Sequence, residues 1–220
     1  MTILALEFSS PQRSVAVLRT GGTAIAAEVV ETGGHGTNAF KMTEQVLAEA
    51  KIEREQIEVM AVGLGPGSYT GIRAAISLAQ GWQLARGVKL LGVSSADCLA
   101  AQARAEKIPG RVSVVIDAQR NEFYLATYEI AADGWREITP LKILSLAEVQ
   151  SRAGADGILI GPEVTRWFPA GRTIFPRAAA LAQLAARRNE FIPGEKLEPI
   201  YLRETNFVKA KAARGFQFKA

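Results

Sequence analysis

Apolar residues in the first half of the chain recur with two different periods, and these periods separate strands from helices. Short apolar or alternating runs, bounded by the turn sequences SSPQR and TGG, are typical of strands. Longer stretches with apolar residues every three or four positions are typical of helices. The expected strands are 2–8, 14–19, 24–30, 58–64 and 88–93, and the expected helices are 38–51, 71–86 and 94–107. The predicted order is β-β-β-α-β-α-β-α.

The second half of the chain starts again with the same plan. Residues 113–130 predict a strand, an acid, a polar turn and a second strand, as do residues 3–18, and Asp117 stands where Glu7 stands. The later elements are expected to be a strand at 135–144, a helix at 145–153, a strand at 157–161 and a helix at 176–190. We therefore expect an α/β protein of two related lobes, residues 1–104 and 105–220, with a turn at KIPGR near the boundary.

The glycine-rich stretch GLGPGSYTGIR, residues 63–73, raises the question of a phosphate-binding loop. It lacks the third glycine of a dinucleotide fingerprint, because Thr70 stands there, and it lacks the lysine of a P-loop. We interpret it as a sharp corner in which Ser68 or Thr70 caps the following helix. Free N–H groups at that helix start could still bind an anion weakly.

The helix after this corner has more apolar surface than packing on one sheet requires. Its polar residues form a narrow stripe, and an apolar arc of about 100° suffices for a helix lying on a sheet. The helix beginning after Thr37 or Asn38 also has an apolar side. The surplus is buried either within the chain or by a second protein. For the second alternative, the candidate interface residues are Phe40, Met42, Val46, Leu47, Ile72, Arg73, Ala75, Ile76, Ala79 and Trp82.

Composition and charge narrow the class of protein. No apolar run approaches the ~18 residues that span a bilayer, no signal peptide is recognisable, and the only cysteine is Cys98. These features favour a cytoplasmic protein that does not enter membranes. Residues 201–220 hold five basic residues and one acid, a net charge of +4, so this basic tail is either a solvated end or a contact for a phosphate backbone such as tRNA.

Few residues are suited to catalysis. His35 is the only histidine, so a site with paired histidines is excluded, and no G-x-S-x-G elbow is present. Glu7, Ser9 and Asp117 are weak candidates for binding a Mg²⁺-nucleotide between the lobes, although the turns SSPQR and AQRN lack the glycines that admit phosphates. We expect no catalytic residue, no metal site and no cofactor.

Several segments together resemble one family. They are TILALEFSS, the His35 loop before a helix, GPGSYTGIRAAISLAQGW, DAQRNEFYLA and EPIYLRE, and they cover most of the chain. In these segments the chain is similar to the TsaB (YeaZ) family, which is needed for the threonylcarbamoyl modification of adenosine in tRNA. The resemblance implies a two-lobed actin-like ATPase fold of the hexokinase–Hsp70–actin class, with duplicated mixed β-sheet cores.

The resemblance also implies a role and partners. Members of the family are regarded as inactive paralogues of the transferase TsaD, whose metal-binding pattern is H-x-x-x-H. Here that segment is HGTNA, from His35 to Ala39, so the second histidine is absent, and Glu7 stands where the family usually has Asp. The family implies pairing with a TsaD-type transferase through the helices 38–51 and 71–86. It also implies a TsaE-type ATPase as a further partner and a homodimer when TsaD is absent.

Two other functions remain open from the residues. One is an actin-fold ATPase or kinase that uses Glu7 and Asp117. The other is a protease acting on TsaD, which the absence of a credible triad disfavours. The leading hypothesis is a non-catalytic scaffold that activates TsaD.

Overall fold

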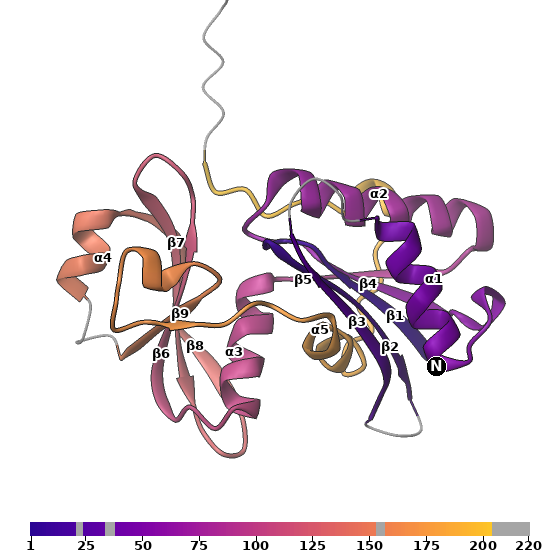
Figure 1. Cartoon of the computed structure of the whole chain (residues 1–220), viewed down its shortest axis with the longest axis horizontal. Helices are drawn as coiled ribbons and strands as arrows, with labels where there is room; N and C mark the ends of the chain where they lie inside the picture. The colour runs from indigo at the N-terminus through magenta and orange to yellow at the C-terminus, as the bar shows by residue number, and fades with distance from the viewer. Residues whose placement is uncertain (21–23, 34–37, 153–156, 204–220) are drawn as a thin grey trace, which may run out of the picture.

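The chain folds into two lobes, each built on a five-stranded mixed sheet (Figure 1). The structure is a computed structural model and describes residues 1–20, 24–33, 38–152 and 157–203. The first sheet contains β1 (Thr2–Glu7), β2 (Gln12–Arg19), β3 (Ile25–Thr32), β4 (Val59–Gly63) and β5 (Lys89–Val93). The second contains β6 (Gly110–Asp117), β7 (Glu122–Ile130), β8 (Trp135–Ser145), β9 (Ile158–Gly161) and β10 (Arg172–Thr173).

The two sheets have the same topology. Their strand orders are β3-β2-β1-β4-β5 and, read from the other edge, β8-β7-β6-β9-β10. In both, the first three strands form an antiparallel meander, and the fourth strand pairs in parallel with the first. This repeated arrangement confirms the predicted duplication and is the two-lobed actin-like ATPase fold.

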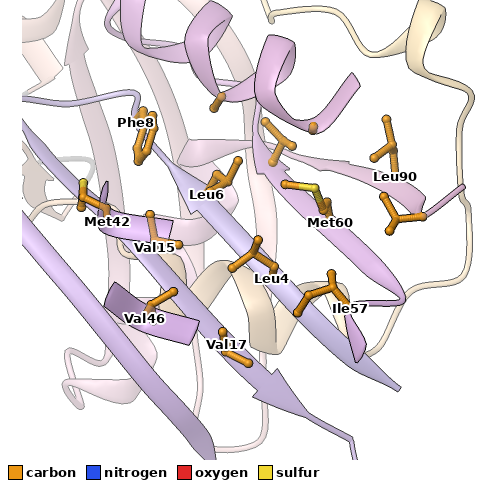
Figure 2. Close-up of a cluster of buried hydrophobic side chains, with 14 of the residues drawn as sticks. Leu4, Leu6, Phe8, Val15, Val17, Met42, Val46, Ile57, Met60 and Leu90 are labelled. Carbon is orange, nitrogen blue, oxygen red and sulfur yellow. The ribbon is translucent and has the colours of Figure 1, made fainter. Parts of the chain in front are cut away.

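Helices cover the two faces of the first sheet. On one face lie α1 (Ala39–Ala50) and α2 (Tyr69–Arg86), and on the other lies α5 (Ala178–Ala185). Figure 2 shows Met42 and Val46 of α1 among the strand residues Leu4, Val15 and Val17, all of which are buried. The helix–sheet packing therefore uses the side chains that the 3.6-residue period marks as apolar.

Two helices pack on the sheet of the other half of the chain. The helix α3 (Ser95–Ala105) contacts β6, β7 and β8, whereas α5, far beyond residue 104, contacts β1 and β2. Glu28 of β3 accepts hydrogen bonds from Arg177 and from the N–H of Ala179, which holds the start of α5 on the first sheet. In Figure 1, α3 and α5 lie between the two sheets, and they contact each other. The two halves are therefore joined by packed helices as well as by a linker.

Further short elements complete the fold. They are α4 (Leu146–Arg152) and the 3₁₀ turns Arg54–Gln56, Val164–Arg166 and Gly194–Lys196. Among the described residues, no helix is long and apolar enough to cross a bilayer.

Candidate partner surface and inter-lobe cleft

The glycine-rich corner positions the start of α2. The helix begins at Tyr69, two residues before the expected start, and the Ser68 side chain accepts a hydrogen bond from the N–H of Gly71 at 3.3 Å. Ser68 is therefore the cap, which confirms one of the two predicted capping residues. Its N–H donates to the carbonyl oxygen of Ser9 at 2.7 Å, and the N–H of Gly65 donates to the Ser95 hydroxyl. Both N–H groups are used within the protein and are not available to an anion.

Two glycines allow this corner to lie directly on the chain that leaves β1. A Cβ at Gly67 would lie 2.0 Å from the carbonyl oxygen of Ser9, and a Cβ at Gly71 would lie 2.0 Å from that of Phe8. Real Cβ atoms do not approach an oxygen this closely. The glycines are needed for contact between two backbone segments, which supports the interpretation of this stretch as a corner.

Glu7 lies in the protein interior. Its side chain is fully buried, accepts hydrogen bonds from the Ser9 N–H and the Ser95 hydroxyl, both at 2.9 Å, and occupies the space that Gly63 leaves open. Burial raises the pKa of the Glu7 carboxyl, against the opposing effect of the hydrogen bonds from Ser9 and Ser95. A carboxyl group in this setting braces β1 against the start of α3.

A cleft of about 790 Å³ lies between the lobes. Ser9 and Asp117 line it, but Glu7 does not. Asp117 accepts hydrogen bonds from the backbone N–H and the side-chain amide of Gln119, at 2.7 and 3.0 Å. The prediction that Glu7 and Asp117 flank a Mg²⁺-nucleotide is therefore wrong for Glu7, because its side chain turns into the core. The hydrogen bonds from Ser9 and Ser95 hold it there as a structural group.

Metal ligands are not clustered in the part of the chain that is described. Within residues 1–20, 24–33, 38–152 and 157–203, no three His, Cys, Asp or Glu side chains are placed to share a metal ion. His35 lies outside these residues.

A long groove with an apolar floor runs between α1 and α2. It has a volume of about 720 Å³. Its apolar lining residues are Ala39, Phe40, Ala74, Leu78, Gly81, Trp82 and Ala85. Phe40 is 69% exposed, an unusual state for a phenylalanine. Two ion pairs border the groove, Arg54 with Glu44 at 2.8 Å and Arg86 with Glu55 at 3.5 Å. An apolar centre with a charged border is the usual anatomy of a protein interface.

Most of the residues predicted for the partner interface do not reach this surface. Seven of the ten are buried within the chain: Met42, Val46, Leu47, Ile72, Ala75, Ile76 and Ala79. Phe40 and Arg73 are exposed and Trp82 is partly buried, so these three can touch a partner. The seven buried residues belong to the first of the two alternatives, burial within the chain, because they fill the space between the helices and the first sheet.

Exposed residues of α2 outside the ten candidates include Ala74, Gly81, Ala85 and Leu84, of which Leu84 is 89% exposed. In the sequence they belong to the same apolar pattern as the buried face, so the pattern alone does not separate them from it. Two residues of the predicted polar stripe on this helix, Gln80 and Gln83, do not face solvent fully. Both are partly buried and hydrogen-bond the backbone of Gly194.

Comparison with known proteins decides the family. The structure superimposes on YeaZ from Pseudomonas aeruginosa with a TM-score of 0.78 at 30% sequence identity, covering 91% of this chain and 99% of that one. The chain belongs to the TsaB (YeaZ) family. A protein named tRNA threonylcarbamoyladenosine biosynthesis protein TsaB from Escherichia coli is 27% identical, with 92% of this chain and 95% of that protein covered. TsaB from Haemophilus influenzae is also 27% identical, with 92% and 94% covered.

A family model described for the transferase TsaD also matches this chain. Residues 28–200 match the model described as "TsaD: tRNA N6-adenosine threonylcarbamoyltransferase". The match extends across both lobes, including α1, α2 and α5. The family model and the TsaB relatives thus both connect the chain with tRNA threonylcarbamoyladenosine biosynthesis.

Proposed function

We propose that this chain acts in tRNA threonylcarbamoyladenosine biosynthesis as a non-catalytic subunit that pairs with and activates a TsaD-type transferase. The relatives that carry the TsaB name support the pathway. The groove between α1 and α2 is the observation that carries the pairing, because it is an exposed apolar surface on an otherwise well-packed lobe.

The non-catalytic role is supported by the state of the candidate acids. Glu7 is enclosed, so the acids that line the cleft are Asp117 and Glu163, and neither is the acid that ends β1. A Mg²⁺-nucleotide enzyme of this fold class needs oxygen ligands that face the phosphates. Of the two acids that the sequence offered for this task, Glu7 faces the core and only Asp117 faces the cleft.

Size is compatible with a specific partner. The helices α1 and α2 are 12 and 18 residues long, and side by side they present a surface on the order of 450 Å². Flanking loops bring this area toward the ~800 Å² per partner of a specific complex. The same face serves a homodimer when TsaD is absent, and a TsaE-type ATPase binds the assembled pair. The basic tail, residues 201–220, contacts tRNA in this proposal, and its residues 204–220 lie outside the described residues.

The experiment is an affinity measurement between the chain and TsaD from the same organism, with Ala74→Arg as the test variant. Ala74 is exposed on α2 and lines the groove, and arginine is a good helix former, so the helix is preserved while a charge enters the apolar floor. We expect at least about a tenfold loss of affinity, since an unpaired charge would be desolvated at the interface.

Ala170→Arg is the matched control, because Ala170 is exposed in the second lobe and far along the chain from the groove. Equal affinities for Ala74→Arg, Ala170→Arg and the unchanged chain would exclude the groove as the docking site. Absence of any complex with the unchanged chain would contradict the proposed function itself.

A further inference from the structure

A second pocket lies on a different part of the molecule, where α3, α5 and the β7–β8 hairpin meet. Its volume is about 630 Å³, within the ~300–1,000 Å³ range of small-ligand sites. It shares no lining residue with the α1–α2 groove or with the inter-lobe cleft. Neither the family comparison nor the proposed pairing with TsaD uses this pocket.

The floor of this pocket is apolar, and alanines form much of it. Ala101 and Ala105 of α3 face Ala180 and Leu184 of α5 across it. Trp135, at the start of β8, forms part of the wall and packs edge-on against buried Tyr128 at a ring-centroid separation of 5.3 Å. The tryptophan is thus fixed in place while part of its ring remains accessible, which suits it to contact a planar group.

The rim of the pocket is cationic. Arg104, Lys107 and Arg187 line it, and no acidic side chain does. Within the described part of the chain, none of the three forms an ion pair. Neighbouring arginines differ in this respect, since Arg188 pairs with Asp97 and Arg172 with Glu106. The pocket therefore gathers three positive charges that have no ion-pair partner among the described residues.

Arg104 is held in position by the protein. Its Nε and Nη2 groups donate to the carbonyl oxygen of Ala132 at 3.4 and 3.0 Å. A guanidinium group has five N–H donors, so three remain for a ligand. A cation fixed in this way loses little side-chain entropy when it binds an anion.

Lys107 occupies a backbone position that favours glycine. Its φ is +55°, in the left-handed region, at the turn that ends α3. Any residue with a Cβ is strained in this conformation relative to glycine. The chain thus carries a charged side chain at the pocket rim where glycine would favour folding.

From this geometry we propose that the pocket binds a nucleoside phosphate, with the base against Trp135 and the apolar floor and the phosphate among Arg104, Lys107 and Arg187. An accessible indole supplies a stacking surface, and arginine and lysine supply charge-assisted hydrogen bonds to phosphate oxygens. The ligand is either a free nucleotide or a nucleotide within an RNA strand, because both present the same base and phosphate.

The test is isothermal titration calorimetry of the full-length chain with AMP, with ATP and with a short single-stranded oligoribonucleotide, without divalent cations. Lys107→Gly is the central variant, because it removes a cation while relieving the left-handed backbone. We expect it to weaken binding about fivefold to tenfold while the midpoint of thermal unfolding stays the same or rises. Arg187→Gln is expected to weaken binding to a similar extent.

Arg13→Gln is the control, because Arg13 lines the inter-lobe cleft and not this pocket. Trp135→Phe provides a second readout, since it should abolish the quenching of tryptophan fluorescence that the ligand causes. Binding of AMP or ATP identifies a free nucleotide, and binding of the oligoribonucleotide alone identifies RNA; either supports the proposal if Lys107→Gly weakens it. Binding that is unchanged in Lys107→Gly and Arg187→Gln would overturn it, whatever Arg13→Gln does, as would absence of binding by all three ligands.

Discussion

Gly67 lies against the carbonyl oxygen of Ser9 so closely that a Cβ at position 67 would be 2.0 Å from that oxygen. The next residue's N–H donates to the same oxygen at 2.7 Å. The glycine-rich corner and the chain leaving β1 are thus joined backbone to backbone, and this contact sets where α2 starts.

Gly67→Ala is therefore expected to destabilise the fold by about 2–4 kcal/mol, because the new methyl group overlaps Ser9 and because φ is +147° at this position. Gly81→Ala is the matched control, since nothing lies within 4 Å of the position a Cβ would take there. In a helix interior it should stabilise by about 0.5–1 kcal/mol. Denaturant unfolding measures both changes, and equal effects of the two would refute the proposed contact.

The packing of α5 on the first sheet predicts that residues 1–104 do not fold alone. Ala178, Leu181, Ala182 and Ala185 are buried against the face of the sheet that α1 and α2 do not cover. Without α5 that apolar face would be exposed, and a sheet with one bare face is not expected to hold a stable structure. Circular dichroism during heating of the fragment should show no cooperative transition. A sharp transition would mean that the lobes are independent domains at residue 104.

The buried carboxyl of Glu7 predicts a particular pH dependence of stability. Its pKa is raised above the ordinary value of 4.5, so the folded state binds the proton more tightly than the unfolded state does. The resulting stabilisation is complete below the unfolded pKa and is lost as pH rises through the folded pKa. Glu7→Gln removes this titration and keeps an oxygen to accept from Ser9. As pH rises above 4.5, the unchanged chain should lose stability that the variant does not lose. The free energy of unfolding of the variant should therefore rise relative to that of the unchanged chain.

Denaturant titrations of both proteins across the acidic to neutral range check this prediction. A difference in unfolding free energy that stays constant with pH would show that Glu7 has the same pKa in both states.

The start of the basic tail is held on α2 by aromatic contacts. Tyr201 stacks on Tyr69 at a centroid separation of 5.6 Å, and the guanidinium of Arg73 lies 4.6 Å from the Tyr69 ring. Tyr201→Ala should cost about 0.5–1.5 kcal/mol and increase amide exchange at Ile200, whose N–H donates to Leu64. Tyr201→Phe keeps the ring and should behave like the unchanged chain. Mass-spectrometric hydrogen exchange distinguishes these results, and identical exchange in the alanine variant would show that the stacking does not hold the segment.

The central strands β1 and β4 were predictable because their apolar runs are buried on both faces, which leaves a strong signal in residues such as Ile3, Leu4 and Val62. The side of α2 that is buried could not be predicted, because alanine occurs on both the buried and the exposed side of this helix. Ala75 and Ala79 are buried while Ala74 and Ala85 are exposed, and the same residue type cannot mark either face.

The direction of the Glu7 side chain and the packing of α5 on the first sheet also could not be predicted from the sequence. An acid at the end of a strand is equally consistent with a ligand and with a buried brace, and only the hydrogen bonds from Ser9 and Ser95 decide. The apolar residues of α5 predict a helix that packs on a sheet but do not specify which sheet. Contact with β1 and β2 depends on tertiary structure, including the ion pair between Glu28 and Arg177.

The proposal that this chain is a partner subunit of TsaD is tested most directly by light scattering after size exclusion, on the chain alone and mixed with TsaD from the same organism. We expect the mixture to give a species with the mass of a one-to-one complex, and any homodimer of the chain to disappear as that species forms. Two separate peaks with the masses of the individual proteins would contradict the account.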